Sequence, residues 1–325
     1  MVSAVIFVAT SCVSPLTGFA FWETNLAYEG ESIYNYLQVK NLSDRTILST
    51  NVLFGVQSVT MKDKGLTGMY YDTALAAPAL ADNANSALIL GMGTGTYARQ
   101  LKQYYPKMNI TGVEIDQKIT DLAGEYFDEP ADIPVTTYDG RAWLAASHDK
   151  YDVIMVDAYQ DITIPFQMSS TEFFTMVREH LNPGGVMVVN MNMISDGQGS
   201  INEALSDTIA SVFGNGNTLT ADVPNTTNRE LFAKKPGSGS EENSMQQASK
   251  ALNLRETTYE RTGSEDLEWY MEEVASRFRK VNEPDSASTI LTDDKAPVEV
   301  LGMHAIDQII ADEAGPYRQI LKDEG

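Results

Sequence analysis

Short apolar runs alternate with helical patterns from Ser86 onward, and this rhythm constrains the fold more than any other feature of the chain. The apolar runs have few polar interruptions, which is typical of strands that are buried on both faces of a sheet. Strands that alternate with helices form a parallel sheet. The strands are expected at residues 87–90, 110–115, 135–138, 153–156 and 186–190. The sequence therefore predicts an α/β fold with a mostly parallel sheet and helices on both faces.

The chain is expected to have four parts. Residues 1–24 begin with an uncharged run, and residues 25–80 are expected to form a small antiparallel β domain. Residues 81–235 hold the α/β domain, and residues 236–325 hold a linker and C-terminal helices that pack on that domain. The linker is rich in Gly, Ser, Glu and Asn, which is typical of a flexible surface segment.

Local patterns predict further elements within these parts. In the small β domain, strands are expected at 34–39, 46–49 and 52–60, with a helix at 71–80. A final pair of strands is expected at 219–223 and 230–233. The C-terminal part is expected to form helices at 245–252, 266–281 and 303–312.

The uncharged run covers residues 1–22, which is long enough to cross a bilayer. Pro15 and several Ser and Thr residues disfavour a membrane helix, and no basic flank precedes the run as in a secretory signal. A membrane anchor and a packed peripheral segment both fit this pattern. The single cysteine, Cys12, agrees with a reducing compartment. We therefore expect a cytoplasmic catalytic domain, either free or attached to a membrane through residues 1–22.

The acidic composition favours cationic ligands over nucleic acids. The chain has 45 acidic and 23 basic residues and a formal net charge of −22. Nucleic-acid binding is excluded on this basis, because it needs clustered Lys and Arg. A negative surface attracts cationic small molecules over a long range, although the same charge also serves solubility. No metal site is expected, because His148, His180 and His304 are far apart in sequence.

The glycines Gly91, Gly93 and Gly95 lie between an expected strand and an expected helix. Glycines there permit a tight turn close to a ligand, and the N-terminus of the helix offers free N–H groups. The dinucleotide fingerprint would instead place its third glycine at Thr96. The next strand ends at Glu114, where a carboxylate can accept hydrogen bonds from both ribose hydroxyls. This combination predicts the cofactor site of a Rossmann-like S-adenosylmethionine-dependent methyltransferase fold, preceded here by the small antiparallel β domain.

Acidic residues follow the next two expected strands. Asp139 and Gly140 follow the third strand, where Asp139 can accept from an adenine amino group and Gly140 permits close approach. Asp157 and Asp161 follow the fourth strand. Ligands of open α/β sheets bind outside the carboxyl ends of the strands, so both acids face the crevice of the glycines. Two carboxylates beside a sulfonium cation suit a cationic second substrate, because a carboxylate can anchor an ammonium group and accept its proton.

Several motifs together resemble one known family. In the α/β part they lie at 91–97, 113–116, 138–141, 151–154, 156–159, 171–174 and 181–186. Motifs at 31–36, 55–58, 70–72 and 292–299 extend the likeness on both sides. The chain resembles the spermidine synthases, or polyamine aminopropyltransferases, and most closely the bacterial variants fused to a membrane-transporter-like region. The resemblance runs from about Glu31 to Glu299 and is weakest at 236–281.

This resemblance implies transfer of an aminopropyl group from decarboxylated S-adenosylmethionine to putrescine or a related polyamine, with no metal. It implies that Glu114 holds the ribose, that Asp139 holds the adenine and that Asp157, with Asp161, is catalytic. It also implies that Gln57 lines the cofactor pocket. The substrate-binding residues that it implies are Tyr71, Asp72, Tyr159 and Gln160. A homodimer is expected from the family as well.

Two departures from the family's motifs keep alternatives open. Thr94 stands where an acid is usual in the glycine motif, and Gln160 stands where the second catalytic-loop acid is usual. The first alternative is a methyltransferase that uses S-adenosylmethionine itself as the donor. The second is a non-catalytic domain of a membrane protein that senses polyamines or nucleosides, an idea motivated by the uncharged run at 1–22.

Overall fold

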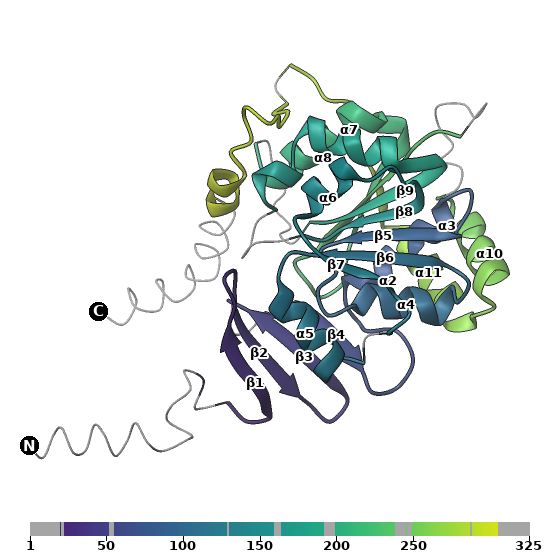
Figure 1. Cartoon of the computed structure of the whole chain (residues 1–325). Coiled ribbons are helices and arrows are strands. Elements are labelled where there is room, and N and C mark those ends of the chain that lie inside the picture. The colour runs from purple at the N-terminus through teal and green to yellow at the C-terminus, as the bar shows by residue number, and fades with distance from the viewer. Residues whose placement is uncertain are drawn as a thin grey trace, which may run out of the picture.

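An eight-stranded sheet crosses the centre of the molecule in the computed structural model of the chain (Figure 1). The structure describes residues 20, 23–51, 55–128, 130–158, 164–191, 199–237, 245, 249–286 and 288–304. The strand order is β12-β10-β11-β9-β8-β5-β6-β7, and the five strands from β9 to β7 run parallel while the other three pair antiparallel. The strands are β5 (Ser86–Leu90), β6 (Asn109–Glu114), β7 (Val135–Thr137), β8 (Tyr151–Val156), β9 (Leu181–Met191), β10 (Thr218–Asp222), β11 (Arg229–Lys234) and β12 (Phe278–Lys280).

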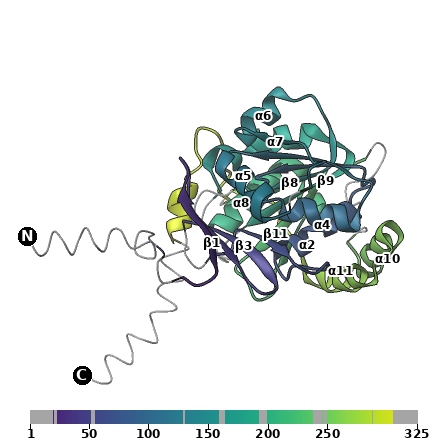
Figure 2. The same cartoon turned by 60° about the horizontal axis from the view of Figure 1, so that its bottom comes forward.

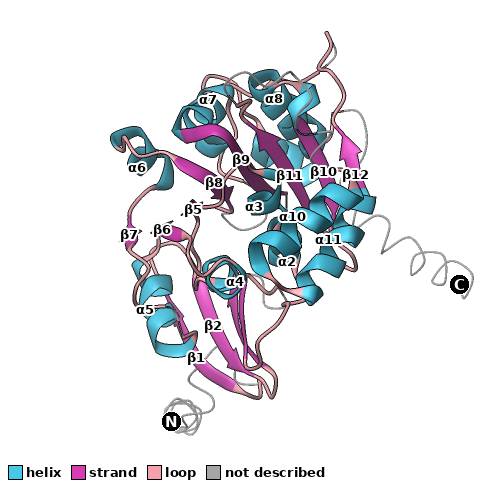
Figure 3. Ribbon diagram, turned by 90° about the vertical axis from the view of Figure 1, so that its right-hand side faces the viewer, coloured by secondary structure: helices cyan, strands magenta, loops and turns pink. Residues whose placement is uncertain are grey.

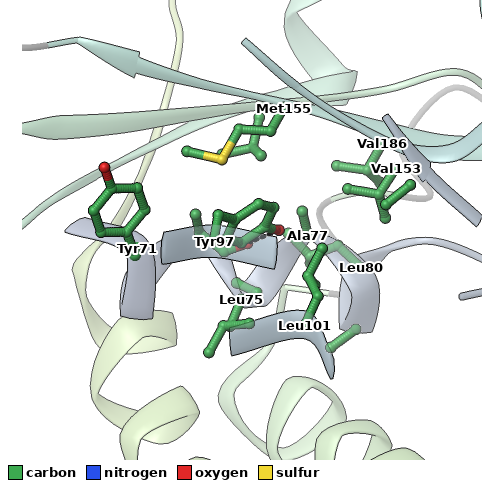
Figure 4. Packing of buried hydrophobic residues seen from close by; sticks show 14 of the residues in the cluster. Tyr71, Leu75, Ala77, Leu80, Tyr97, Leu101, Val153, Met155 and Val186 are labelled. Carbon is green, nitrogen blue, oxygen red and sulfur yellow. Dashed lines mark hydrogen bonds between the residues drawn. The ribbon is translucent and has the colours of Figure 1, made fainter. Parts of the chain in front are cut away.

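Helices cover both faces of this sheet (Figure 3). One face packs against α2 (Tyr70–Ala74), α3 (Ala76–Leu80), α4 (Thr96–Tyr104), α10 (Ala251–Thr262) and α11 (Glu265–Arg277). The other face packs against α6 (Gly140–Ala146), α7 (Thr171–His180) and α8 (Ile201–Phe213). In the first layer, Tyr97 of α4 lies beneath Met155 of β8, and Leu75 and Leu80 fill the space beside it (Figure 4). The predicted α/β fold, with its mostly parallel sheet and helices on both faces, is confirmed.

A separate four-stranded antiparallel sheet precedes the main sheet, as predicted. Its strands are β1 (Leu26–Glu31), β2 (Tyr36–Asn41), β3 (Arg45–Thr50) and β4 (Ser58–Met61). Helix α5 (Gln117–Tyr126) contacts β6 and β7 of the large sheet and also packs on the small sheet, where Ile119 and Leu122 lie against Leu37, Val39 and Leu48 (Figures 1 and 2). One helix of the α/β region therefore joins the two sheets.

The small sheet differs from the sequence expectation in two places. Strand β1 was not expected, because Glu29, Gly30 and Glu31 interrupt its apolar pattern and all of its side chains remain at least partly exposed. The strand expected at 52–60 begins only at Ser58 and ends at Met61; residues 52–54 lie outside the described part. Strand β1 is held by its backbone pairing with β2 rather than by burial of its side chains.

The C-terminal expectations were also partly wrong. Of the helix expected at 245–252, Met245 is helical and 246–248 lie outside the described residues, whereas a helix that runs from Ala251 to Thr262 was not expected. Only Leu254 and Thr258 are buried among the described side chains of this helix, so it has almost no apolar stripe. The helix expected at 266–281 ends at Arg277, after which Phe278–Lys280 form β12. Phe278 turns away from the helix because its ring packs edge-on against Phe232, with ring centroids 5.6 Å apart. The predicted antiparallel pair β10 and β11 is present.

Some expectations fall on residues that the structure does not describe. The uncharged run 1–22 lies outside it except for Ala20, and so does most of the helix expected at 303–312, of which 303 and 304 are helical. In the part of the chain that is described, no helix has both the length and the apolar character needed to span a bilayer.

Candidate active site

The glycine turn after β5 packs against the end of β8 and the start of β4. Gly91, Gly93 and Gly95 have φ values of 89°, 56° and 82°, a left-handed region that other residues rarely adopt. A Cβ on Gly91 would overlap the backbone carbonyl of Asp157, and one on Gly93 would lie 2.7 Å from Ser58 Oγ. The turn therefore lies between the end of β8 and the small sheet, and only glycine fits at its two points of contact.

Replacement of Gly91 tests this packing. Gly91→Ala is expected to lower the melting temperature and to abolish nucleoside binding, because left-handed backbone costs an L-residue about 1–2 kcal/mol and the methyl group displaces the end of β8. The matched control is Gly124→Ala in α5, whose added methyl meets nothing within 4 Å and should stabilise the helix by about 0.5–1 kcal/mol. Thermal melts of both variants give the measurement. Equal melting temperatures for Gly91→Ala and the parent would contradict this account.

A cavity of about 270 Å³ opens where the carboxyl ends of β5, β6 and β8 meet the small sheet. Eight residues that the sequence singled out line it: Gln57, Tyr71, Gly91, Gly93, Glu114, Asp139, Gly140 and Asp157. Tyr34 and Asn35, from the turn between β1 and β2, line its opposite side. The structure thus gathers residues from both sheets around one hollow.

Glu114 is fixed at the floor of this cavity. Its side chain is 7% exposed, and its two carboxylate oxygens accept from the backbone N–H groups of Gly93 at 2.8 Å and Asp116 at 3.0 Å. Burial raises the pKa of Glu114, while these backbone hydrogen bonds lower it. Each carboxylate oxygen keeps a second lone pair, so the group can accept from two adjacent hydroxyls.

Asp116 connects Glu114 to the small sheet. One of its carboxylate oxygens accepts from Ser32 Oγ at 2.5 Å and from Asn35 Nδ2 at 3.0 Å, and the other caps α5. These bonds hold the turn between β1 and β2 over the cavity, which explains why Tyr34 and Asn35 line it.

We call the part of the cavity that Ile115 and Tyr138 line the slot. Ile115 and Tyr138 line the cavity and remain 41% and 56% exposed, which is unusual for large apolar side chains. Asp139 accepts from the backbone N–H of Ala142, and so its carboxylate is oriented at the start of α6 with acceptor capacity left over. The slot can therefore accommodate an aromatic base with a polar edge towards Asp139.

Asp157 also lines the cavity, and two side chains hold its carboxylate. Tyr70 donates from its hydroxyl to Oδ2 at 2.7 Å, and Asn190 donates from Nδ2 to Oδ1 at 2.9 Å. Asn228 Nδ2 donates to Asn190 Oδ1 at 2.9 Å, which orients the Asn190 amide towards Asp157. Burial raises the pKa of Asp157 to about 7, against the lowering effect of both hydrogen bonds, and the nearby charge of Glu114 raises it further.

Two aromatic rings separate Asp157 from the helices behind it. The rings of Tyr70 and Tyr71 pack with centroids 4.0 Å apart, and Tyr71 donates to the backbone carbonyl of Gln57 at 2.7 Å. The predicted residues Gln57 and Tyr71 therefore meet directly at the cavity wall. The aromatic faces beside a carboxylate favour a cationic ligand.

Three residues near Asp157 were missed by the sequence reasoning: Asn190, Asn228 and Glu230. Glu230 is fully buried, and neither of its carboxyl oxygens has a hydrogen-bond partner among the described residues. Burial raises its pKa well above the usual range, and the charge of Asp157 adds to this effect. Asn190 and Glu230 are polar residues within otherwise apolar strands, which is the sequence signal that could have identified them. The two residues pair directly in β9 and β11.

Two of the predicted site residues are not brought to the cavity. Asp72 does not line it, because its carboxylate accepts from Thr67 N, Thr67 Oγ1 and Gly68 N, at 2.7–2.9 Å, and closes the loop before α2. Gly95 also lies outside the lining, at the start of α4. The prediction of Asp72 as a substrate ligand is not supported by this geometry.

The remaining predicted residues follow β8 along the chain. Tyr159, Gln160 and Asp161 lie outside the described residues, so their predicted roles stay predictions. Within the described ranges, no group of three or more His, Cys, Asp or Glu side chains lies close enough to hold a metal ion.

Comparison with known proteins finds similar sequences over much of the chain. The sequence profile of the spermine/spermidine synthase domain matches residues 69–235. The chain is 28% identical over 209 residues to a polyamine aminopropyltransferase of Vibrio vulnificus, covering 61% of this chain and 69% of that protein. It is 37% identical over 131 residues to a polyamine aminopropyltransferase of Corynebacterium efficiens, covering 37% of this chain but only 25% of that longer relative.

Solved structures show the same architecture. A probable spermidine synthase from Corynebacterium glutamicum superposes with a TM-score of 0.56 at 21% identity, covering 82% of this chain and 99% of that one. Spermidine synthase from Thermotoga maritima gives a TM-score of 0.53 at 18% identity, covering 66% of this chain and 74% of that one. At these identities the likeness concerns the fold.

Proposed function

Because the chain belongs to the spermine/spermidine synthase family, we propose that it transfers an aminopropyl group from decarboxylated S-adenosylmethionine to putrescine or a related polyamine. The observation that carries this proposal is that Glu114 and Asp157 line the same cavity. One carboxylate suits the ribose of a nucleoside, and the other suits a cationic amine.

The donor side of the cavity fits an adenosyl sulfonium compound. Glu114 offers two oriented carboxylate oxygens to the ribose hydroxyls, and Asp139 offers an acceptor to the adenine amino group. Gly91 and Gly93 line the cavity, and Asp157 and Ser58 occupy the space that side chains at these positions would need. When bound, the sulfonium compound supplies a carbon activated for displacement by its positive sulfur.

The acceptor side is built to receive an amine. In the reaction, the amine nitrogen forms a bond to the carbon beside sulfur, the C–S bond breaks, and the bonding pair leaves with methylthioadenosine. The nitrogen must lose one proton before it can attack, and the product then forms as a secondary ammonium group. Asp157 anchors the ammonium form and accepts a proton, and its pKa of about 7 makes it a suitable base near neutral pH. Tyr70 and Asn190 hold its carboxylate in place.

The pKa of Asp157 predicts the pH dependence of transfer. Asp157 acts in its ionised form, so kcat/KM should rise with pH through a midpoint of about 7. Asp157 interacts electrostatically with four titratable side chains: Tyr70 and Tyr71 from α2, Glu114 from β6 and Glu230 from β11.

A variant of Asn190 tests whether the pH midpoint belongs to Asp157 rather than to another titratable group. Asn190→Leu removes a hydrogen bond that favours the ionised form, so the midpoint should move to higher pH. Rate profiles over about pH 5.5 to 9 give the measurement. A parent profile that is flat through pH 7, or a midpoint unchanged in Asn190→Leu, would contradict the assignment.

Methyl transfer is the competing function, motivated by the uncharged Thr94 in the glycine turn, although Thr94 does not itself line the cavity. Thr94 is uncharged and fully buried beside the glycine turn, and its hydroxyl has no hydrogen-bond partner among the described residues. The donor half of the cavity serves both reactions. Incubation of the protein with each sulfonium donor and a panel of polyamines, read by mass spectrometry, decides between them: a mass gain of one aminopropyl group supports our proposal, and a methyl gain overturns it.

The predicted homodimer is part of the same proposal and rests on the family alone. Sedimentation of the full chain tests it directly. A sensing domain without catalysis would instead bind both ligands tightly and return both donors unchanged in the mass-spectrometric experiment.

A further inference from the structure

A tight turn at residues 292–295 lies outside the segment that matches the family profile. Its residue Asp293 makes a bidentate ion pair with Arg141, through Nη1 at 2.7 Å and Nη2 at 2.6 Å. The same carboxylate accepts from Ser170 Oγ at 2.5 Å, and the Asp293 backbone N–H donates to Glu172 at 3.0 Å. One carboxylate thus bonds to α6 and to the start of α7 at the same time.

Both of these attachment points adjoin the donor side of the cavity. Arg141 directly follows Asp139 and Gly140, which line it. Its Nη1 also donates at 2.8 Å to the backbone carbonyl of Gln167, which lines the cavity from the other side with Met168. The Arg141 guanidinium is therefore a bridge between two walls of the slot that we assign to the adenine.

The second wall is held by this bridge and by the buried side chain of Met168. Residues Phe166–Met168 form a single 3₁₀ turn, η2, rather than part of a helix or strand layer. A short turn has few hydrogen bonds of its own to fix its distance from α6. An ordinary exposed ion pair contributes little, but a bidentate pair with additional hydrogen bonds has a defined geometry. The Arg141 and Ser170 hydrogen bonds lower the pKa of Asp293, so it stays ionised at neutral pH.

We propose that Asp293 is a positioning residue for the donor site: it orients Arg141, which sets the spacing between Asp139–Gly140 and Gln167–Met168. Asp293 does not itself line the cavity. The inference rests on the proposed function, since it assumes an adenosyl ligand in this slot. According to this inference, the turn at residues 292–295 contributes to donor binding.

The test uses Asp293→Asn in the full chain and calorimetry with methylthioadenosine as the probe. We expect the dissociation constant to rise about tenfold, the effect of losing one charge-assisted interaction at the site. The rate at saturating donor and acceptor should stay within about twofold, because Asp157 is untouched. Arg141→Lys keeps the charge but loses the bidentate pair, so it should weaken binding similarly, and the double variant should be little worse than either single one.

Asp132→Asn is the matched control. Asp132 also pairs with a cation, Lys102 at 2.8 Å, but its side chain is 68% exposed and does not line the cavity. Its removal should leave the affinity unchanged. Unchanged affinity in both Asp293→Asn and Arg141→Lys would overturn the inference, as would a common loss of kcat and stability without loss of affinity. Failure of the parent protein to bind methylthioadenosine would instead contradict the proposed function.

Discussion

Asp157→Asn is expected to slow transfer by roughly a thousandfold, within the range attributed to a positioned acid or base, and to leave methylthioadenosine binding nearly unchanged. The amide has the size of the carboxyl group and can still bond to Tyr70 and Asn190 after reorientation, so the fold should persist. It can neither attract an ammonium group by charge nor accept a proton. The measurement combines single-turnover rates with calorimetry of the nucleoside product.

A variant at the other end of the same strand controls for the change in charge. Asp149 is exposed before the start of β8, far along the strand from the cavity end at Asp157. Asp149→Asn should therefore transfer at the parent rate. If Asp157→Asn lost binding and turnover equally, Asp157 would be a structural support of the donor pocket and not the group that acts on the amine.

Glu114→Gln is expected to weaken methylthioadenosine binding by roughly 10- to 100-fold, because hydrogen bonds to a charged group contribute about 1.5–3 kcal/mol. Both carboxylate oxygens already accept backbone N–H groups of Gly93 and Asp116. The amide of Gln has only one oxygen, so its NH₂ group must face one of those donors. The variant therefore loses acceptors for the ribose and also disturbs the glycine turn.

Calorimetry with methylthioadenosine measures this loss, and Glu125→Gln provides the matched control. Glu125 lies exposed on α5, the helix that follows the same strand. An affinity in Glu114→Gln equal to that of the parent and of Glu125→Gln would show that the ribose is held elsewhere. The two variants together test separate roles in the cavity. Glu114→Gln should lose binding, and Asp157→Asn should lose turnover.

Local sequence was sufficient to predict the positions of Glu114, Asp139 and Asp157 at the cavity. Each follows a short apolar strand of a parallel sheet, and such strands end on the same edge. The glycine turn is a similar case, since left-handed backbone at Gly91 and Gly93 is a local requirement that the residue type reveals. Strand register alone thus brings these groups together.

Asp72 shows where local reasoning failed. It stands next to Tyr70 and Tyr71, which do lie at the cavity, yet its carboxylate turns the other way to accept three hydrogen bonds from the preceding loop. Residues adjacent in a helix point in different directions, and a backbone with free N–H groups nearby competes for any carboxylate. The sequence contains no signal of which ligand such an acid takes.

The α/β fold, the glycine turn and the acids at the strand ends could be predicted from local sequence, because strand periodicity and backbone conformation are properties of neighbouring residues. The support of those acids could not, because it comes from segments that are distant in the chain. Asn190 and Asn228 orient Asp157, Asp116 connects Glu114 to the small sheet, and Asp293 reaches Arg141 from 152 positions away along the chain. These contacts depend on which segments pack together in space, and burial in that packing raises the pKa of Asp157 to about 7.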